Sequence, residues 1–316
     1  MSFDLLFHAP GGQSVSKGRL DRWFAKQPHC TVLTRQADYD NPDTGVHFMW
    51  EYSGDVYGTE GPAPHVILLL NYLRPLPFAD EAADIIDALV AKFGFLVSNP
   101  QDDGKPEPWN RAAFLASYRQ HAGMAARSLL HQHPDAMQQL RILPSERIRR
   151  IWDWNRQQVE RYQWLATLGL DLFIPKVMVL EVQGTVYETF IWGDAVPCII
   201  PPGIDHVLLG REALAPRTGL LRKRRATHEL VPLSALKHIL DAHYMPLPEI
   251  PGALRARRPA DVPELRAALQ ARPAGKDAIN RAIFPDKYDQ VPEADRMAVI
   301  AFSSLLDAEL VSDLEP

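Results

Sequence analysis

A continuous apolar run at residues 66–70, VILLL, constrains the fold more than any other feature of this sequence. Neighbouring side chains of a strand point to opposite faces, so five large aliphatic residues in succession suit a strand that is buried on both faces. We therefore predict a strand over residues 65–72 and place it at the centre of a small sheet.

The elements predicted around this strand make up a compact α+β domain over residues 1–102. Apolar and β-branched runs predict further strands, and apolar residues at helical spacing predict helices. In chain order these are a strand at 3–8, a helix ending near 26, strands at 31–34 and 46–52 on either side of a turn at 40–43, a helix at 79–93 and a strand at 95–98. The order is typical of a mostly antiparallel sheet with helices packed on it. The polar, Pro/Gly-rich stretch at 101–108 predicts the domain boundary.

The rest of the chain, residues 109–316, is predicted to form a second, helix-rich α+β domain. Gln183-Gly184 separates two strand-like runs and indicates a β-hairpin, because glycine permits the positive φ of a tight turn. Helices are expected at 109–131, 145–169, 230–244 and 295–311, and a strand at 206–209. Residues 245–276 contain six prolines and predict an arm with only short helical pieces, and the last helix is acidic.

Composition and charge exclude several classes of function. The chain has 34 Lys and Arg against 39 Asp and Glu, so it is no general polyanion binder. Cys30 and Cys198 match no metal or redox spacing, no run is long enough to span a membrane, and neither a phosphate loop nor a dinucleotide fingerprint is present. We expect a cytoplasmic protein that uses no cofactor, binds no metal and enters no membrane.

Three residues are candidates for catalysis by a metal-independent hydrolase or transferase. Asp194 and Asp205 each lie at the end of a predicted strand beside a Gly or Pro turn, and Arg211 follows shortly after. Carboxylates in such places can act as acids or bases. The simpler interpretation is that an aspartate in a turn bonds to its own backbone.

Other residues are candidates for binding. Arg74 follows the buried strand and needs a carboxylate partner, either in a ligand or within the fold. Trp192, close to Asp194, is a second candidate. Arg222, Lys223, Arg224 and Arg225 form the most basic run, but no aromatic residue is interleaved with it, so an acidic protein or the acidic end of this chain is favoured over nucleic acid. A solvated loop is the alternative interpretation.

Residues 40–48, 71–75 and 93–101 together resemble a pattern found in an uncharacterised family of bacterial proteins. The element order of the first hundred residues is also similar to that of immunity proteins of polymorphic-toxin systems, which bind a toxin and cover its active site. This resemblance implies a protein that acts by binding another protein, in an immunity or accessory role, and it implies no catalytic residue. We therefore expect a non-enzymatic protein-binding protein, with the hydrolase or transferase and weak nucleic-acid binding as alternatives.

Overall fold

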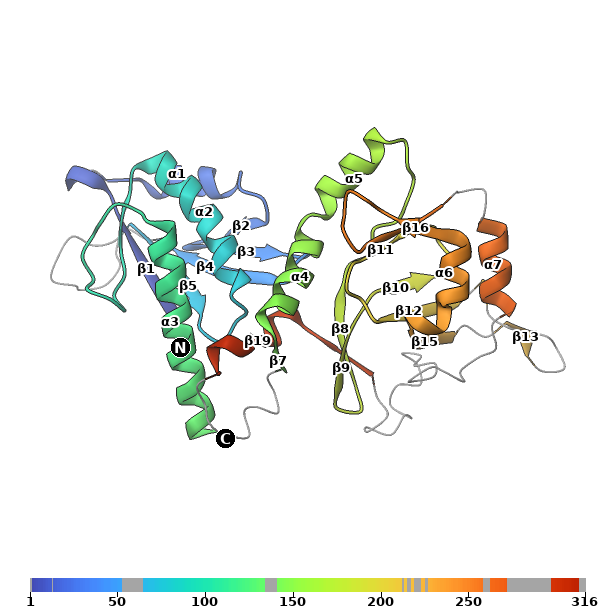
Figure 1. Ribbon diagram of the computed structural model, residues 1–316. Helices are drawn as coiled ribbons and strands as arrows, with labels where there is room; N and C mark the ends of the chain where they lie inside the picture. The colour runs from blue at the N-terminus through green and yellow to red at the C-terminus, as the bar shows by residue number, and fades with distance from the viewer. Residues whose placement is uncertain are drawn as a thin grey trace. The chain divides into compact units, whose positions relative to one another are not determined.

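The protein divides into two compact units, one formed by Met1–Trp152 with Ala301–Pro316 and the other by Asp153–Ile300. The computed structural model describes residues 2–12, 14–52, 65–133, 141–211, 213–214, 217–218, 223–224, 227–257, 262–271 and 297–312. Helix α4 (Ser145–Arg156) begins in the first unit and ends in the second. Figure 1 shows the elements in chain order.

The first unit is built on a six-stranded antiparallel sheet in the order β2-β3-β4-β5-β1-β6. Its elements are β1 (Ser2–His8), η1 (Pro10–Gly12), α1 (Lys17–Phe24), β2 (Cys30–Val32), β3 (Gln36–Asn41), β4 (Val46–Glu51), β5 (Val66–Asn71), α2 (Pro77–Phe93), β6 (Leu96–Ser98), α3 (Arg111–Gln132), β7 (Arg141–Leu143), η7 (Phe302–Ser304), β19 (Leu305–Asp307) and η8 (Ala308–Leu310). Strand β5 is an interior strand, as predicted, and the α+β class is confirmed.

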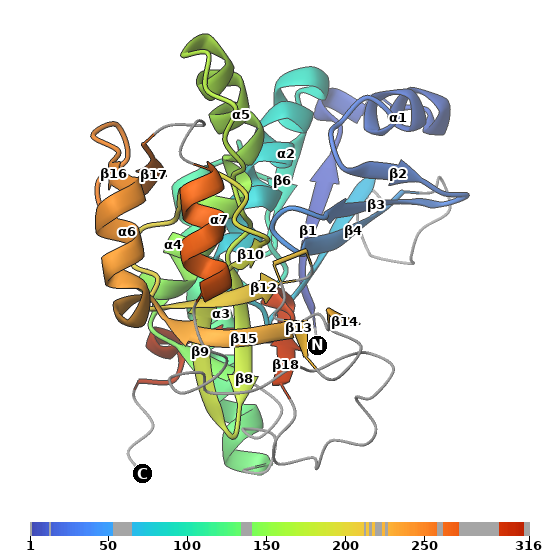
Figure 2. The same ribbon diagram turned by 90° about the vertical axis from the view of Figure 1, so that its right-hand side faces the viewer.

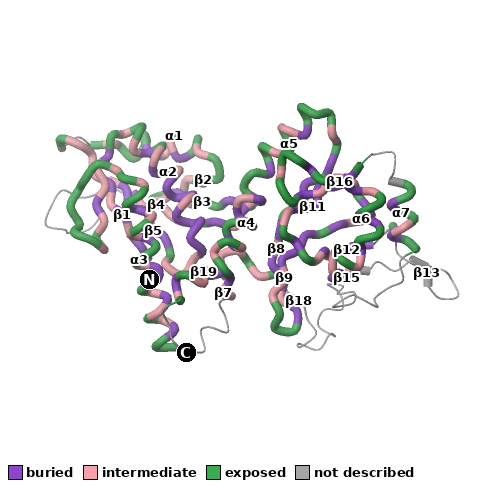
Figure 3. Tube along the Cα trace, in the orientation of Figure 1, coloured by how far each residue is buried: buried purple, intermediate pink, exposed green. Residues whose placement is uncertain are grey.

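Helices α1, α2 and α3 cover one face of this sheet (Figure 1). Phe3 of β1 packs edge-on against Tyr118 of α3, with ring centroids 5.5 Å apart, and Phe24 of α1 lies 5.6 Å from Trp50 of β4. Burial alternates along β1, β3 and β4, as Figure 3 shows, because every second side chain points into this aromatic core. The side chains between them form the open face of the sheet.

A buried carboxylate ties α2 to β3 on the helical face. Glu81 is only 2% exposed and accepts hydrogen bonds from Tyr39 Oη at 2.6 Å and Asn41 Nδ2 at 3.0 Å, both on β3. It also accepts one from Trp152 Nε1 at 2.6 Å. Because three donors satisfy the carboxylate, its burial is tolerated and β3 is held against the helix.

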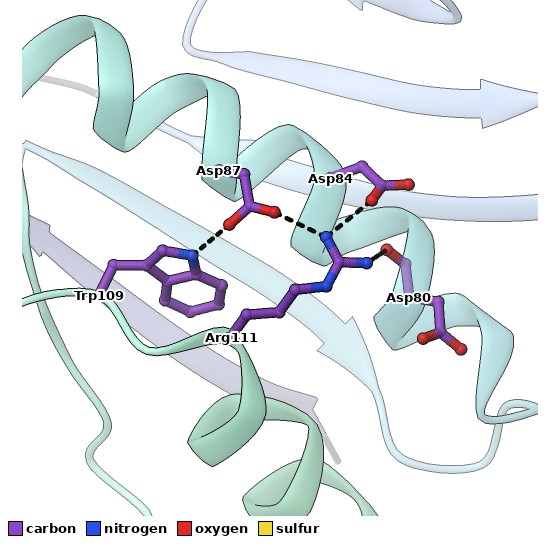
Figure 4. A network of polar contacts seen from close by, with 5 residues as sticks. All are labelled: Asp80, Asp84, Asp87, Trp109 and Arg111. Atoms are coloured by element: carbon purple, nitrogen blue, oxygen red, sulfur yellow. Dashed lines mark hydrogen bonds and ion pairs between the residues drawn. The ribbon is translucent and has the colours of Figure 1, made fainter.

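The expected domain boundary at 101–108 does not separate the two units, because α3 belongs to the first one. The guanidinium of Arg111, at the start of α3, lies 2.8 Å from Asp84 Oδ1 and 2.6 Å from Asp87 Oδ2 of α2 (Figure 4). Trp109 donates its indole N–H to Asp87 as well. The polar stretch is therefore a surface loop inside the first unit, and the chain leaves that unit only within α4.

The second unit contains several small sheets with helices beside them. Its elements are α5 (Gln158–Thr167), β8 (Met178–Val182), β9 (Thr185–Thr189), β10 (Ile191–Gly193), β11 (Ile199–Ile200), β12 (His206–Arg211), β13 (Arg217–Thr218), β14 (Lys223–Arg224), β15 (Thr227–Pro232), η3 (Leu233–Leu236), α6 (Lys237–His243), β16 (Tyr244–Pro246), β17 (Leu254–Ala256), α7 (Val262–Ala271) and β18 (Met297–Ile300). Gln183 and Gly184 have φ of 52° and 75° and connect β8 to β9, which confirms the hairpin. Figure 2 shows α6 and α7 side by side.

Three expectations about the later part of the chain are wrong in part or in whole. The acidic C-terminal helix expected over 295–311 is absent from residues 297–311, which form β18, η7, β19 and η8, because β18 pairs with β8 and β19 with β7. The helix expected over 230–244 begins only at α6, and residues 227–232 form β15 instead. Gln157 interrupts the helix expected over 145–169.

The Pro-rich arm, residues 245–276, is partly strand. Residues 244–246 and 254–256 form the pair β16 and β17, which extends β11 into a three-stranded sheet. The short helical piece expected here is present as α7. Residues 258–261 and 272–276 of the arm lie outside the described part of the chain.

Candidate functional site

A groove of about 460 Å³ lies on the first sheet and is the strongest candidate for a functional site. Its lining comes from β3, β4 and β5 and from the residues that follow β5: Asp38, Tyr39, Asp40, His47, Phe48, Met49, Leu69, Asn71 and Arg74. In the ladder, Asp38 pairs with Met49 and Met49 with Leu69, so these three side chains form one row across the open face. Asp40 pairs with His47 in the adjacent row.

Strand β3 carries the acidic side of this groove, and sequence reasoning missed it. Its outward residues Gln36, Asp38 and Asp40 are poor strand formers, so the end of the strand was interpreted as a turn. A period-two signal is nevertheless present, since Ala37 and Tyr39 alternate with them and are buried. That alternation was the one available clue to the strand.

Arg74 lies in the groove as a half-buried cation without a carboxylate partner among the described residues. Its Nη1 donates to two backbone carbonyl oxygens, those of Leu73 at 3.2 Å and Ser303 at 2.9 Å. Its Nε is buried without a hydrogen-bond partner. Burial lowers the pKa of the guanidinium from its ordinary value, and the nearby Tyr118 offsets this effect only in part. The two carbonyls orient the group but leave its charge uncompensated.

The two aspartates of the groove also have no cationic partner in the part of the chain that the structure describes. Asp38 accepts a hydrogen bond from Gln36 Nε2 at 2.8 Å, and Asp40 is exposed. Neither carboxylate forms an ion pair with any described residue, Arg74 included. The groove therefore holds positive and negative groups that do not neutralise each other, with the apolar side chains of Met49 and Leu69 beside them.

A second hollow, of about 220 Å³, lies where the loop after β6 meets the start of α3. Next to it, Ser117 Oγ donates to Asp102 Oδ2 at 3.0 Å and lies 3.3 Å from His121 Nδ1. The same Nδ1 is 2.9 Å from the carbonyl oxygen of Ser117, a contact in which the nitrogen must donate. A nitrogen that carries this proton cannot accept one from the serine, so His121 Nδ1 does not act as a general base for Ser117.

The three catalytic candidates do not form one site. The carboxylate oxygens of Asp194 accept hydrogen bonds from the backbone nitrogens of Ala213 and Leu214, each at 3.0 Å, as expected of an aspartate in a turn. Arg211 is 1% exposed and forms a buried ion pair with Glu229 at 3.1 Å. Asp205 is exposed and precedes β12, whereas Arg211 is the last residue of that strand. At about 3.3 Å per residue, the two residues lie about 20 Å apart along the strand.

Trp192 packs the core of the second unit. Its side chain is fully buried, its Nε1 donates to the carbonyl of Val196 at 2.9 Å, and its ring meets Tyr244 edge-on. It therefore presents no surface to a partner, contrary to the expectation that it binds one.

The basic run is only partly within the described residues. Arg222 and Arg225 lie outside them, and Lys223 and Arg224 are described only as the backbone of β14, which pairs with β13. Binding through this run stays a prediction.

Cys198 is buried and Cys30 is half-buried. Burial raises the pKa of the Cys30 and Cys198 thiols to about 12, so neither supplies a thiolate near neutral pH. Within the described ranges, no three His, Cys, Asp or Glu side chains converge as metal ligands do. In the same ranges no helix combines the length and the apolar character needed to span a bilayer.

In comparisons with known proteins, no family model, no curated protein and no solved structure matches this chain.

Proposed function

We propose that this chain is a non-enzymatic protein that binds another protein through the groove on the open face of its first sheet. One observation carries the proposal: a half-buried guanidinium, Arg74, lies in that groove, and no carboxylate among the described residues pairs with it. A partly desolvated charge without a counter-ion costs stability, so a ligand carboxylate is the natural compensation.

The remaining chemistry supports binding over catalysis. Asp194 and Arg211 are both engaged in bonds that hold the second unit together, and His121 Nδ1 donates to a carbonyl oxygen and does not act as a base for Ser117. The immunity or accessory role implied by the resemblance of the first hundred residues belongs to the same proposal.

The test is a capture experiment with the intact protein as bait in a lysate of its native cells. Three baits are compared after a moderate salt wash: wild type, Arg74→Gln, and Arg22→Gln as a matched control at an exposed arginine of α1. We expect one protein to be retained stoichiometrically by wild type and by Arg22→Gln, and to be lost from Arg74→Gln. A clean wild-type bait, or retention that does not depend on Arg74, overturns the proposal.

A further inference from the structure

We infer that the groove recognises an extended segment of its partner that carries a basic residue and an acidic residue on either side of an apolar one. The inference rests on the proposed function and adds the chemistry of the partner to it. The basic residue meets Asp38 and Asp40, and the acidic residue meets Arg74.

The positions of the charges in the sheet support this pattern. Asp38 and Asp40 lie on β3, and Arg74 follows the end of β5, with β4 in between. Two strand spacings separate β3 from β5, which places the acidic and basic sides of the groove about 10 Å apart or slightly more. An extended chain advances about 3.3 Å per residue, so the two charges of the partner should stand about three to five residues apart.

Two residues of the floor are apolar, and the polar residues His47 and Asn71 line the groove beside them. Met49 and Leu69 are neighbours in the ladder and both are half-buried, although the sequence predicts Leu69 inside a strand covered on both faces. An apolar side chain of the partner, placed between its two charges, would cover them. The groove thus offers three kinds of contact: the carboxylates of β3, a thioether and an aliphatic side chain on β4 and β5, and the guanidinium that follows β5.

The guanidinium is prepared to accept a carboxylate. Nη1 is used by the carbonyls of Leu73 and Ser303, and Nε is shielded from solvent. Nη2 has no partner among the described residues and is not among the buried atoms. A ligand carboxylate therefore reaches Nη2 without breaking a bond that orients Arg74.

The walls of the groove favour a macromolecular segment over a small molecule. Asp40, His47 and Asn71 are exposed, so the hollow is shallow. Small-molecule sites usually enclose 70–90% or more of their ligand's surface, which a hollow with such exposed walls does not. A peptide segment can lie across the rows and continue beyond them.

The experiment is a selection of displayed random 12-residue peptides on the intact chain, repeated with three variants. Wild type should enrich peptides with Lys or Arg and Asp or Glu three to five positions apart and an apolar residue between. Peptides selected on Arg74→Gln should no longer be enriched in Asp or Glu. Peptides selected on Asp40→Lys should carry Asp or Glu at the position where wild type selects Lys or Arg. Glu249→Gln, an exposed acid of the second unit, should leave the pattern unchanged.

Synthetic copies of the enriched peptides give the magnitude. Arg74→Gln should bind these peptides about 10- to 100-fold more weakly than wild type does, which is the range for losing a hydrogen bond to a charged group. The affinity for Glu249→Gln should stay within a factor of two of wild type, about 0.4 kcal/mol.

Several results would overturn the inference. They are no enriched peptide, enriched peptides without both charges, a pattern that ignores Arg74 and Asp40, or binding of free arginine or glutamate in place of peptides. If the lysate experiment still captures a protein through Arg74, the proposed function stands and only the partner's chemistry is wrong. If both experiments fail, the function fails as well.

Discussion

Replacement of Glu81 by alanine should strongly destabilise the first unit. The carboxylate is 2% exposed and accepts hydrogen bonds from Tyr39, Asn41 and Trp152 at 2.6–3.0 Å. Its removal leaves three donors without their acceptor, and each such donor costs about 1–3 kcal/mol. Allowing for relaxation and entry of water, we expect Glu81→Ala to lower the free energy of unfolding by about 3–5 kcal/mol.

Urea unfolding followed by tryptophan fluorescence measures this effect, since Trp50 and Trp152 are both buried in the same unit. Lys92→Ala, at an exposed position of the same helix, is the control and should change stability by less than about 0.5 kcal/mol. A loss below about 1 kcal/mol for Glu81→Ala would show that the carboxylate does not hold β3, and the reasoning would be wrong.

Three further predictions concern buried groups. Burial raises the pKa of Asp307, so the contribution of this group to stability is present at low pH and is lost as pH rises through the raised pKa. In urea unfolding from pH 4 to 7, the free energy of unfolding of Asp307→Asn should therefore fall less with pH than that of wild type. Parallel pH profiles of the two proteins would refute this prediction. Cys30 and Cys198 should react with a thiol reagent at pH 8 only after unfolding, and fast labelling of the native protein would contradict their raised pKa values. Arg211→Met should cost about 3–5 kcal/mol in urea unfolding because it leaves buried Glu229 without its ion pair, and the double variant with Glu229→Leu should cost less; equal losses would argue against the pair.

The sequence predicts strand β5 of the first sheet better than strand β3. The apolar run at 66–70 can only be accommodated as a buried strand or helix, and its shortness and the turns around it favour the strand. By contrast, β3 presents Gln36, Asp38 and Asp40 outward, so strand propensity alone argues against it. What makes it a strand is the burial of Tyr39 and its bond to Glu81, 42 residues away. A local pattern does not contain that contact.

The C-terminal error has the same origin. Residues 305–307 pair in parallel with β7, more than 160 positions earlier, and Asp307 accepts the backbone N–H of Leu76 at 2.8 Å. The apolar spacing in this stretch fits a helix equally well, and only these distant partners decide against one.

Only part of the candidate site can be predicted from the sequence. Arg74 can be singled out from the sequence because a guanidinium beside a buried strand needs a partner. That it lies without a described carboxylate, in one groove with Asp38 and Asp40, depends on how β3, β4 and β5 align. For the candidates of the second unit, the sequence does not show the partners: Asp194 accepts backbone N–H groups and Arg211 pairs with Glu229, and the fold sets both contacts.

Photo-crosslinking from the groove floor tests the central claim most directly. A photoreactive amino acid replaces Met49 in the intact protein, and the control carries it in place of Val299, an exposed apolar residue of the second unit. In a lysate of the native cells, we predict that a protein is crosslinked at position 49 but not at 299, and that Arg74→Gln abolishes the product. Absence of a product at position 49, or a product indifferent to Arg74, would contradict the assignment of this groove as a protein-binding site.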